Sequence, residues 1–194
     1  MQYKVNKNQQ LSLFESSTTY QVKKPSLKPD FTMSKTYLES WKKRIYYYQQ
    51  QAQNQKQQQT YIIPEQKENL WNTQSFNPFS LSTHCDQFYD LPQYQESQSC
   101  LYFILDTHLP LLLYVGETKL SPKQRWINHD CKSYIQKYIE LHRKYQLPVN
   151  IRSAFWWGIS TDRVIRQTLE KDLILKWRSP FNKESWQWWG QPFK

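Results

Sequence analysis

Two short apolar runs joined by a four-residue connection constrain the fold of this 194-residue chain more than any other feature. The runs are Leu101–Asp106 and Leu111–Gly116, and the connection is Thr107-His-Leu-Pro110. Apolar runs of this length with turn residues between them are typical of two strands in a hairpin. The sequence predicts a third strand at Val149–Ile159.

Helical patterns separate and follow these strands. Ser121 followed by Pro122 is typical of a helix start, and helical periodicity continues over 134–145. A last helix is expected from Ser160 or Thr161 to Trp177. The order strand, strand, helix, strand, helix predicts an α+β fold, in which a small antiparallel three-stranded sheet is flanked by helices.

The N-terminal half has a different character, and we expect it to form a helical and irregular extension to a domain at residues 100–194. Residues 1–33 predict a loose polar tail. A helix is expected over 34–60, first amphipathic and then Gln-rich, since glutamine fills eight of the eleven positions 49–59 and favours a helix that buries nothing. Residues 61–99 predict an irregular arm that packs on a neighbouring element.

The amphipathic part of this helix places cations beside apolar residues. Its apolar positions recur in steps of three and four: Leu38, Trp41, Ile45 and Tyr48. We expect this face to dock on the C-terminal domain while Lys42, Lys43 and Arg44 bind nucleic-acid phosphates. An equally open alternative is that the helix only covers the core and leaves these charges in solvent.

The charge balance indicates a polyanionic partner. The net charge is +10, with 11 basic and 8 acidic residues before Gln98 and 15 basic and 8 acidic residues from it onward. Cations neutralise phosphates and aromatic rings, which are 16% of the chain, stack on bases. An acidic membrane surface would attract the same charge.

The cysteines and the apolar runs bear on location. Cys85, Cys100 and Cys131 are an odd number without CxxC spacing, and no secretory signal is visible, so we expect a reducing, cytoplasmic setting. His84 beside Cys85 does not complete a familiar zinc spacing. The longest apolar run, 109–116, is far below the roughly 20 residues that cross a bilayer, so we expect no membrane partner.

Glu170 is the most informative single residue in the last predicted helix. It falls within the arc of that helix that faces the core, among Ile165, Leu169, Leu173, Ile174 and Trp177. A buried carboxylate is usually paired, protonated or bound to a cation. The helix alone favours a structural ion pair, with Arg125, Arg152 or Arg166 as the candidate partners.

Two further pairs carry weaker signals. Tyr102 and Tyr114 lie near each other across the predicted hairpin, either as packing residues or with both hydroxyls on one face. Arg125 and His129 are four residues apart and share a helix face, so the two side chains either bind one phosphate together or lie on a solvated helix surface.

Taken together, these residues resemble the GIY-YIG nuclease family in order and spacing. The elements that carry the resemblance cover about residues 100–182 and are Cys100-Leu-Tyr102, Tyr114-Val-Gly116-Glu-Thr118, Arg125, His129, Glu170 and Asn182 in Ser179-Pro-Phe-Asn182. The chain departs from the family pattern where Cys100 replaces the first glycine. It also has 44 residues between Arg125 and Glu170, more than the shortest members use.

The resemblance implies a metal-dependent endonuclease that hydrolyses phosphodiester bonds in nucleic acid, with DNA the expected substrate. It implies that Glu170 holds one Mg²⁺ or Mn²⁺ ion, and it turns the balance for this residue toward the functional role. Tyr102 would accept a proton from the attacking water or orient it, and Tyr114 would position water or phosphate. Arg125 would neutralise charge that develops on the phosphate.

Asn182 would brace this site, and His129 is the weaker candidate for phosphate contact or proton transfer. The main alternative is an inactive nucleic-acid-binding module with the same fold. An interaction protein built on the terminal aromatic residues is a third possibility, although those rings suit packing better. The sequence leaves the oligomeric state open.

Overall fold

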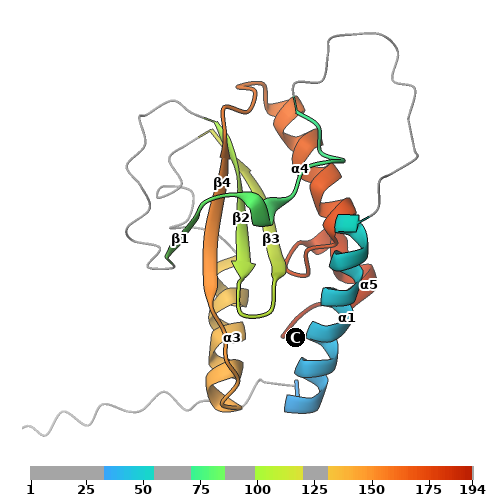
Figure 1. Cartoon of the computed structure of the whole chain (residues 1–194), viewed down its shortest axis with the longest axis vertical. Coiled ribbons are helices and arrows are strands. Elements are labelled where there is room, and N and C mark those ends of the chain that lie inside the picture. The colour runs from blue at the N-terminus through green and yellow to red at the C-terminus, as the bar shows by residue number, and fades with distance from the viewer. Residues whose placement is uncertain (1–32, 55–70, 86–98, 120–130, 194) are drawn as a thin grey trace, which may run out of the picture. The chain divides into compact units, whose positions relative to one another are not determined.

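The structure, a computed structural model, describes residues 33–54, 71–85, 99–119 and 131–193, all within one unit that spans Phe31–Lys194 (Figure 1). The elements in chain order are α1 (Lys35–Asn54), the 3₁₀ turn η1 (Pro78–Ser80), β1 (Thr83–Cys85), β2 (Cys100–Asp106), β3 (Leu111–Thr118), α3 (Cys131–Lys144), β4 (Ile151–Trp157), α4 (Arg163–Trp177), the 3₁₀ turn η2 (Lys183–Ser185) and α5 (Trp186–Trp189).

The strands form one antiparallel sheet in the order β1-β4-β2-β3, and the α+β class predicted from the sequence is confirmed. β2 and β3 are the two arms of the predicted hairpin, and β4 pairs with the other side of β2. Every residue of β2 is buried, because this strand lies inside the sheet and is covered on both faces. β3 lies at one edge of the sheet.

The predicted number of strands was wrong, since the sheet has four strands rather than three. The additional strand, β1, lies in the segment expected to be an irregular arm, and it pairs with β4 from Thr83 opposite Ala154 to Cys85 opposite Arg152. Its three residues, Thr-His-Cys, show no apolar alternation. The strand exists because the edge of β4 offers unpaired backbone groups, which a sequence pattern does not reveal.

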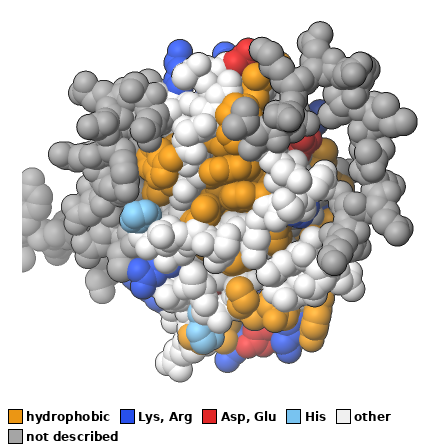
Figure 2. All heavy atoms as spheres, turned by 45° about the horizontal axis from the view of Figure 1, so that its top comes forward, with side chains coloured by type: hydrophobic (Ala, Val, Ile, Leu, Met, Phe, Trp, Pro, Cys, Tyr) orange, Lys and Arg blue, Asp and Glu red, His pale blue; other side chains and the backbone are white. Residues whose placement is uncertain are grey.

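The two faces of the sheet are covered by different elements. Tyr102 and Ile104 face a cluster with residues of α1 and α3, whereas Leu101 and Phe103 face a cluster with residues of α4. Residues 71–81 pack against the second cluster, where Phe76 stacks on Trp156 with ring centroids 4.0 Å apart. On the face shown in Figure 2, hydrophobic side chains gather near the middle, and most of the visible Lys and Arg side chains lie toward the rim.

The helices predicted over 134–145 and up to Trp177 are confirmed as α3 and α4. The start of α4 differs slightly from the prediction, because Asp162 rather than Ser160 or Thr161 caps it, with its side chain accepting from the Val164 N–H at 2.7 Å. The helix predicted after Ser121 lies outside the described residues. Among the described segments, no helix has the length and apolar content to cross a bilayer.

The amphipathic helix predicted from residue 34 is confirmed as α1, but the prediction that its Gln-rich part buries nothing was wrong. Leu38, Trp41 and Ile45 are buried as expected. Gln49, which was expected to reach solvent, is fully buried, and α1 packs against β3. The proposed domain boundary between this helix and residues 100–194 stays a prediction.

Lys42 also differs from its predicted position, because it lies on the buried side of α1. Its Nζ is 3.3 Å from Asp106 Oδ2 and 2.8 Å from His142 Nε2. Tyr138 donates its hydroxyl to the same Asp106 oxygen at 2.8 Å. Burial lowers the pKa of Lys42 against the opposing effect of Asp106, and the ammonium is engaged inside the protein instead of facing phosphate.

The buried position of Lys42 and the exposed position of Lys43 predict different effects on stability. Lys42→Ala should lower the free energy of unfolding by about 3–5 kcal/mol, because it leaves the buried Asp106 carboxylate without its cation. Lys43→Ala should change it by less than about 0.5 kcal/mol. Urea denaturation of both variants measures the difference, and equal effects would contradict this account of the cluster.

Candidate active site

Tyr102 and Tyr114 meet on the hairpin, as the sequence predicted. Tyr102 is paired with Gly116 and Ile104 with Tyr114, and the two tyrosine ring centroids are 5.9 Å apart. A Cβ atom at Gly116 would overlap the outer end of the Tyr102 ring. Glycine at this position therefore lets the Tyr102 ring cross β3 beside Tyr114.

Glu170 approaches these tyrosines from α4, which runs beside the edge strand β3 (Figure 1). Leu169 and Leu173 anchor α4 to the sheet, and Glu170 between them is half-buried. Ile165, expected on the same buried face, is 40% exposed, because it lies in the first turn of the helix. The apolar anchors thus set the rotation of the helix and leave Glu170 at the border of the core.

The electrostatics of Tyr114 show that Glu170 is one of the charges that act on it. The pKa of Tyr114 is raised well above its ordinary value, first by burial and then by the neighbouring Tyr102, Cys131 and Glu170. A side-chain hydrogen bond with Tyr102 adds to this shift, and the phenol stays protonated at neutral pH.

Asn182 holds the strand that carries Tyr114. Its Oδ1 accepts from the Val115 N–H at 3.0 Å, and its Nδ2 donates to the Val115 carbonyl at 2.8 Å. The Ser179 hydroxyl donates to Asn182 Oδ1 at 2.6 Å and fixes the amide. Asn182 was expected to brace the site, and in the structure its side-chain amide bonds both backbone groups of Val115 at the outer edge of β3.

Residues 98–185 match the family model of the GIY-YIG catalytic domain. The resemblance seen in the sequence is confirmed for this segment, and such a domain points to nuclease activity. No curated protein and no solved structure gives a significant match to the chain.

Two residues predicted for the GIY-YIG site, Arg125 and His129, lie outside the described residues, so their placement stays a prediction. Lys43 and Arg44 are exposed on α1, apart from Lys42. Within the described segments, no three His, Cys, Asp or Glu side chains gather as metal ligands. Among the described site candidates, Tyr102 and Tyr114 form a ring pair, Asn182 bonds Val115 beside Tyr114, and Glu170 acts electrostatically on Tyr114.

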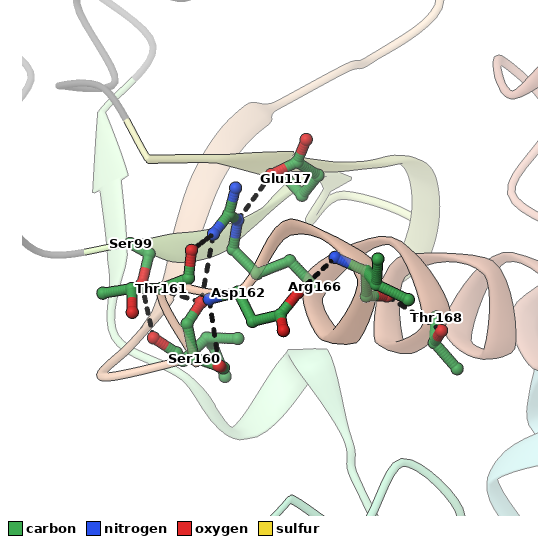
Figure 3. A network of polar contacts seen from close by, with 9 residues as sticks. Ser99, Glu117, Ser160, Thr161, Asp162, Arg166 and Thr168 are labelled. Carbon is green, nitrogen blue, oxygen red and sulfur yellow. Dashed lines mark hydrogen bonds and ion pairs between the residues drawn. The ribbon is translucent and has the colours of Figure 1, made fainter.

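An ion pair that the sequence did not predict joins α4 and β3, the elements that carry the candidate residues Glu170 and Tyr114. Arg166, one turn before Glu170, donates from Nε to Glu117 Oε2 at 2.7 Å (Figure 3). Its Nη1 donates to the carbonyls of Ser160 and Thr161 at 3.1 and 2.6 Å. Arg166, one of the expected partners of Glu170, is thus engaged by Glu117, and the pair ties α4 to the end of β3.

A weak signal for this pair was available, because Glu117 directly follows Gly116 and Arg166 precedes Glu170 by one helical turn. The pairing itself depends on the distance between α4 and β3. Only the tertiary structure supplies that distance.

Loss of the Glu117 carboxylate should destabilise the domain. Glu117→Ala is expected to lower the free energy of unfolding by about 2 kcal/mol, less than a fully buried pair, because 18% of the Glu117 side chain is exposed while Arg166 is buried. Glu184→Ala, at an exposed position in η2, is the matched control and should leave stability nearly unchanged. Chemical denaturation would contradict the account if the two variants were equally stable.

Proposed function

We propose that the chain is an endonuclease that hydrolyses phosphodiester bonds in DNA and depends on a divalent cation, Mg²⁺ or Mn²⁺. The observation that carries the proposal is the meeting of Tyr102, Tyr114 and Glu170 at the edge of β3. Two phenols on the paired strands β2 and β3 and one carboxylate on α4, which is tied to β3, can together bind water, phosphate and a cation.

The donor set suits a hard cation. Glu170 offers carboxylate oxygen at the border of the core, and magnesium is commonly bound through one or two carboxylates with water and substrate phosphate as further ligands. A cation held there would polarise the phosphoryl group and stabilise the departing alkoxide.

The chain's own residues have separate tasks in this proposal. The Tyr102 hydroxyl orients the attacking water, or Tyr102 accepts a proton from that water as a phenolate, which requires a nearby cation to favour loss of the phenol proton. Tyr114, which is protonated at neutral pH, positions water or phosphate by hydrogen bonding. Arg125 neutralises charge on the phosphate, His129 adds a phosphate contact or a proton transfer, and both assignments rest on the family resemblance.

Nucleic-acid binding extends in this proposal to the outer face of α1. Lys43 and Arg44 are exposed there, and the ring of Tyr47 is 65% exposed. Cations beside an exposed ring suit phosphates and bases. Lys42 is left out, because Asp106 and His142 occupy its ammonium inside the protein.

Glu170→Gln should separate cleavage from binding. The single-turnover rate on labelled linear, branched and single-stranded DNA and on RNA, with Mg²⁺ or Mn²⁺, should fall by about 10²-fold or more, the size of one lost electrostatic contact to the transition state. Affinity for the nucleic acid should change little, and Glu140→Gln at an exposed site of α3 is the control.

Other results would point elsewhere. A wild-type protein that binds nucleic acid but never cuts it, with either cation, would favour the inactive binding module. A lowered melting temperature at an unchanged cleavage rate would make Glu170 a structural ion-pair partner.

Replacing Lys43 and Arg44 together by Ala should weaken nucleic-acid binding and flatten its salt dependence. The slope of log K against log salt should decrease in magnitude by about 2, since each lost phosphate contact removes nearly one released counterion. The matched control replaces Arg143 and Lys144, two exposed cations of α3. An unchanged slope in a salt titration would assign α1 to scaffolding.

A further inference from the structure

The free edge of β3 is bonded by a second amide besides Asn182, and this one comes from α1. Gln49 Oε1 accepts from the Leu112 N–H at 2.9 Å, and Gln49 Nε2 donates to the Leu112 carbonyl at 2.9 Å. One side chain thereby satisfies both backbone groups of a strand residue, as a neighbouring strand would. Leu112 and Val115, the residue held by Asn182, flank Tyr114 on either side.

Gln49 also reaches α4. Its Nε2 donates to the carbonyl of Trp177, the last residue of that helix, at 3.0 Å. The same amide therefore connects the strand that carries Tyr114 with the helix that carries Glu170. Gln49 is fully buried, whereas Gln51 and Gln53 on the same helix are exposed.

The location of Gln49 in the chain is informative. The GIY-YIG match covers residues 98–185, and α1 lies before it. Nevertheless the Gln49 amide makes three hydrogen bonds to this segment, and Tyr48 adds another from its hydroxyl to the Lys176 carbonyl at 3.2 Å. An element outside the matched segment thus fixes the distance between two of its site-bearing elements.

We propose that Gln49 is a positioning residue of the nuclease site, acting through Leu112 and Trp177 to hold Tyr114 and Glu170 in register. The inference rests on the proposed nuclease function. It makes α1 part of the catalytic unit, independently of any contact that α1 makes with nucleic acid.

Two substitutions of Gln49 test the inference. Gln49→Leu introduces an apolar side chain of similar size that makes none of the three hydrogen bonds. The single-turnover cleavage rate at saturating DNA and Mg²⁺, per folded protein, should fall by about 10-fold or more, because small displacements of reacting groups are costly in rate. The KM for DNA should stay within about 2-fold, since Gln49 is buried away from substrate.

Gln49→Glu tests whether the hydrogen bonds of Gln49 can be partly restored by protonating the introduced carboxyl. A protonated carboxyl can accept from the Leu112 N–H and donate to one carbonyl, whereas an ionised carboxylate faces two carbonyl oxygens with nothing to donate. Burial and these carbonyls raise the pKa of the introduced carboxyl. The rate relative to wild type should therefore be highest below that pKa and should fall as pH rises through it.

Gln53→Leu and Gln53→Glu are the matched controls, because they make the same changes at an exposed position of α1. Both should follow the wild-type rate and pH profile. Melting temperatures of all four variants, taken at each pH, keep the rate measurements within the folded range.

Each result decides the inference. A Gln49→Leu protein that melts earlier but cuts at the wild-type rate would overturn it, since Gln49 would then serve stability alone. If Gln49→Leu does not fold, the pH dependence of Gln49→Glu decides, and a ratio to wild type that is flat and equal to the Gln53→Glu control overturns it. Absence of cleavage by the wild-type protein is a different failure, which would overturn the proposed nuclease and the inference with it.

Discussion

The hydrogen-bonding requirement of one edge strand organises the site in this protein. β3 is paired with β2 on one side only, and buried backbone N–H and C=O groups on its other side need partners. Gln49 bonds Leu112, the Phe181 N–H donates to the Leu113 carbonyl at 3.0 Å, and Asn182 bonds Val115. Two segments distant in sequence, α1 and residues 181–182, thus converge on four consecutive residues, of which Tyr114 is the one that carries a polar side chain.

This convergence has a chemical consequence, because the elements that hydrogen-bond to β3 also connect it to α4, the helix that carries Glu170. α4 ends at Trp177, whose carbonyl accepts a hydrogen bond from Gln49. The Arg166–Glu117 pair ties the start of α4 to the end of β3. The helix is therefore attached to the strand at both of its ends, and Glu170 lies between the attachments. Side chains held on regular elements in this way keep their separation better than side chains on loops.

A second buried polar cluster anchors α1 at the hairpin end of the sheet. Asp106 accepts from Lys42 and Tyr138 on one oxygen and from the N–H groups of His108 and Asn150 on the other. His142 donates from Nδ1 to the Tyr138 carbonyl, which leaves Nε2 to accept from Lys42, and burial lowers the His142 pKa. A cluster whose polar groups are all hydrogen-bonded specifies one docking position for the helix, since any shift would leave a buried charge without its partner.

The sequence by itself determined the parts of the protein that depend on local pattern and spacing. Apolar runs around Thr107–Pro110 predicted the hairpin and the approach of Tyr102 to Tyr114, and helical periodicity placed Glu170 on the helix face toward the core. Tertiary structure decided what depends on partners far away along the chain. Lys42 and Gln49 look like solvent-facing residues of a polar helix, and β1 looks like loop, because each gains its role only from Asp106, Leu112 or the edge of β4. A buried polar group is stable only where the folded protein supplies a hydrogen-bonding or charged partner. A sequence pattern does not show which distant residue that partner is.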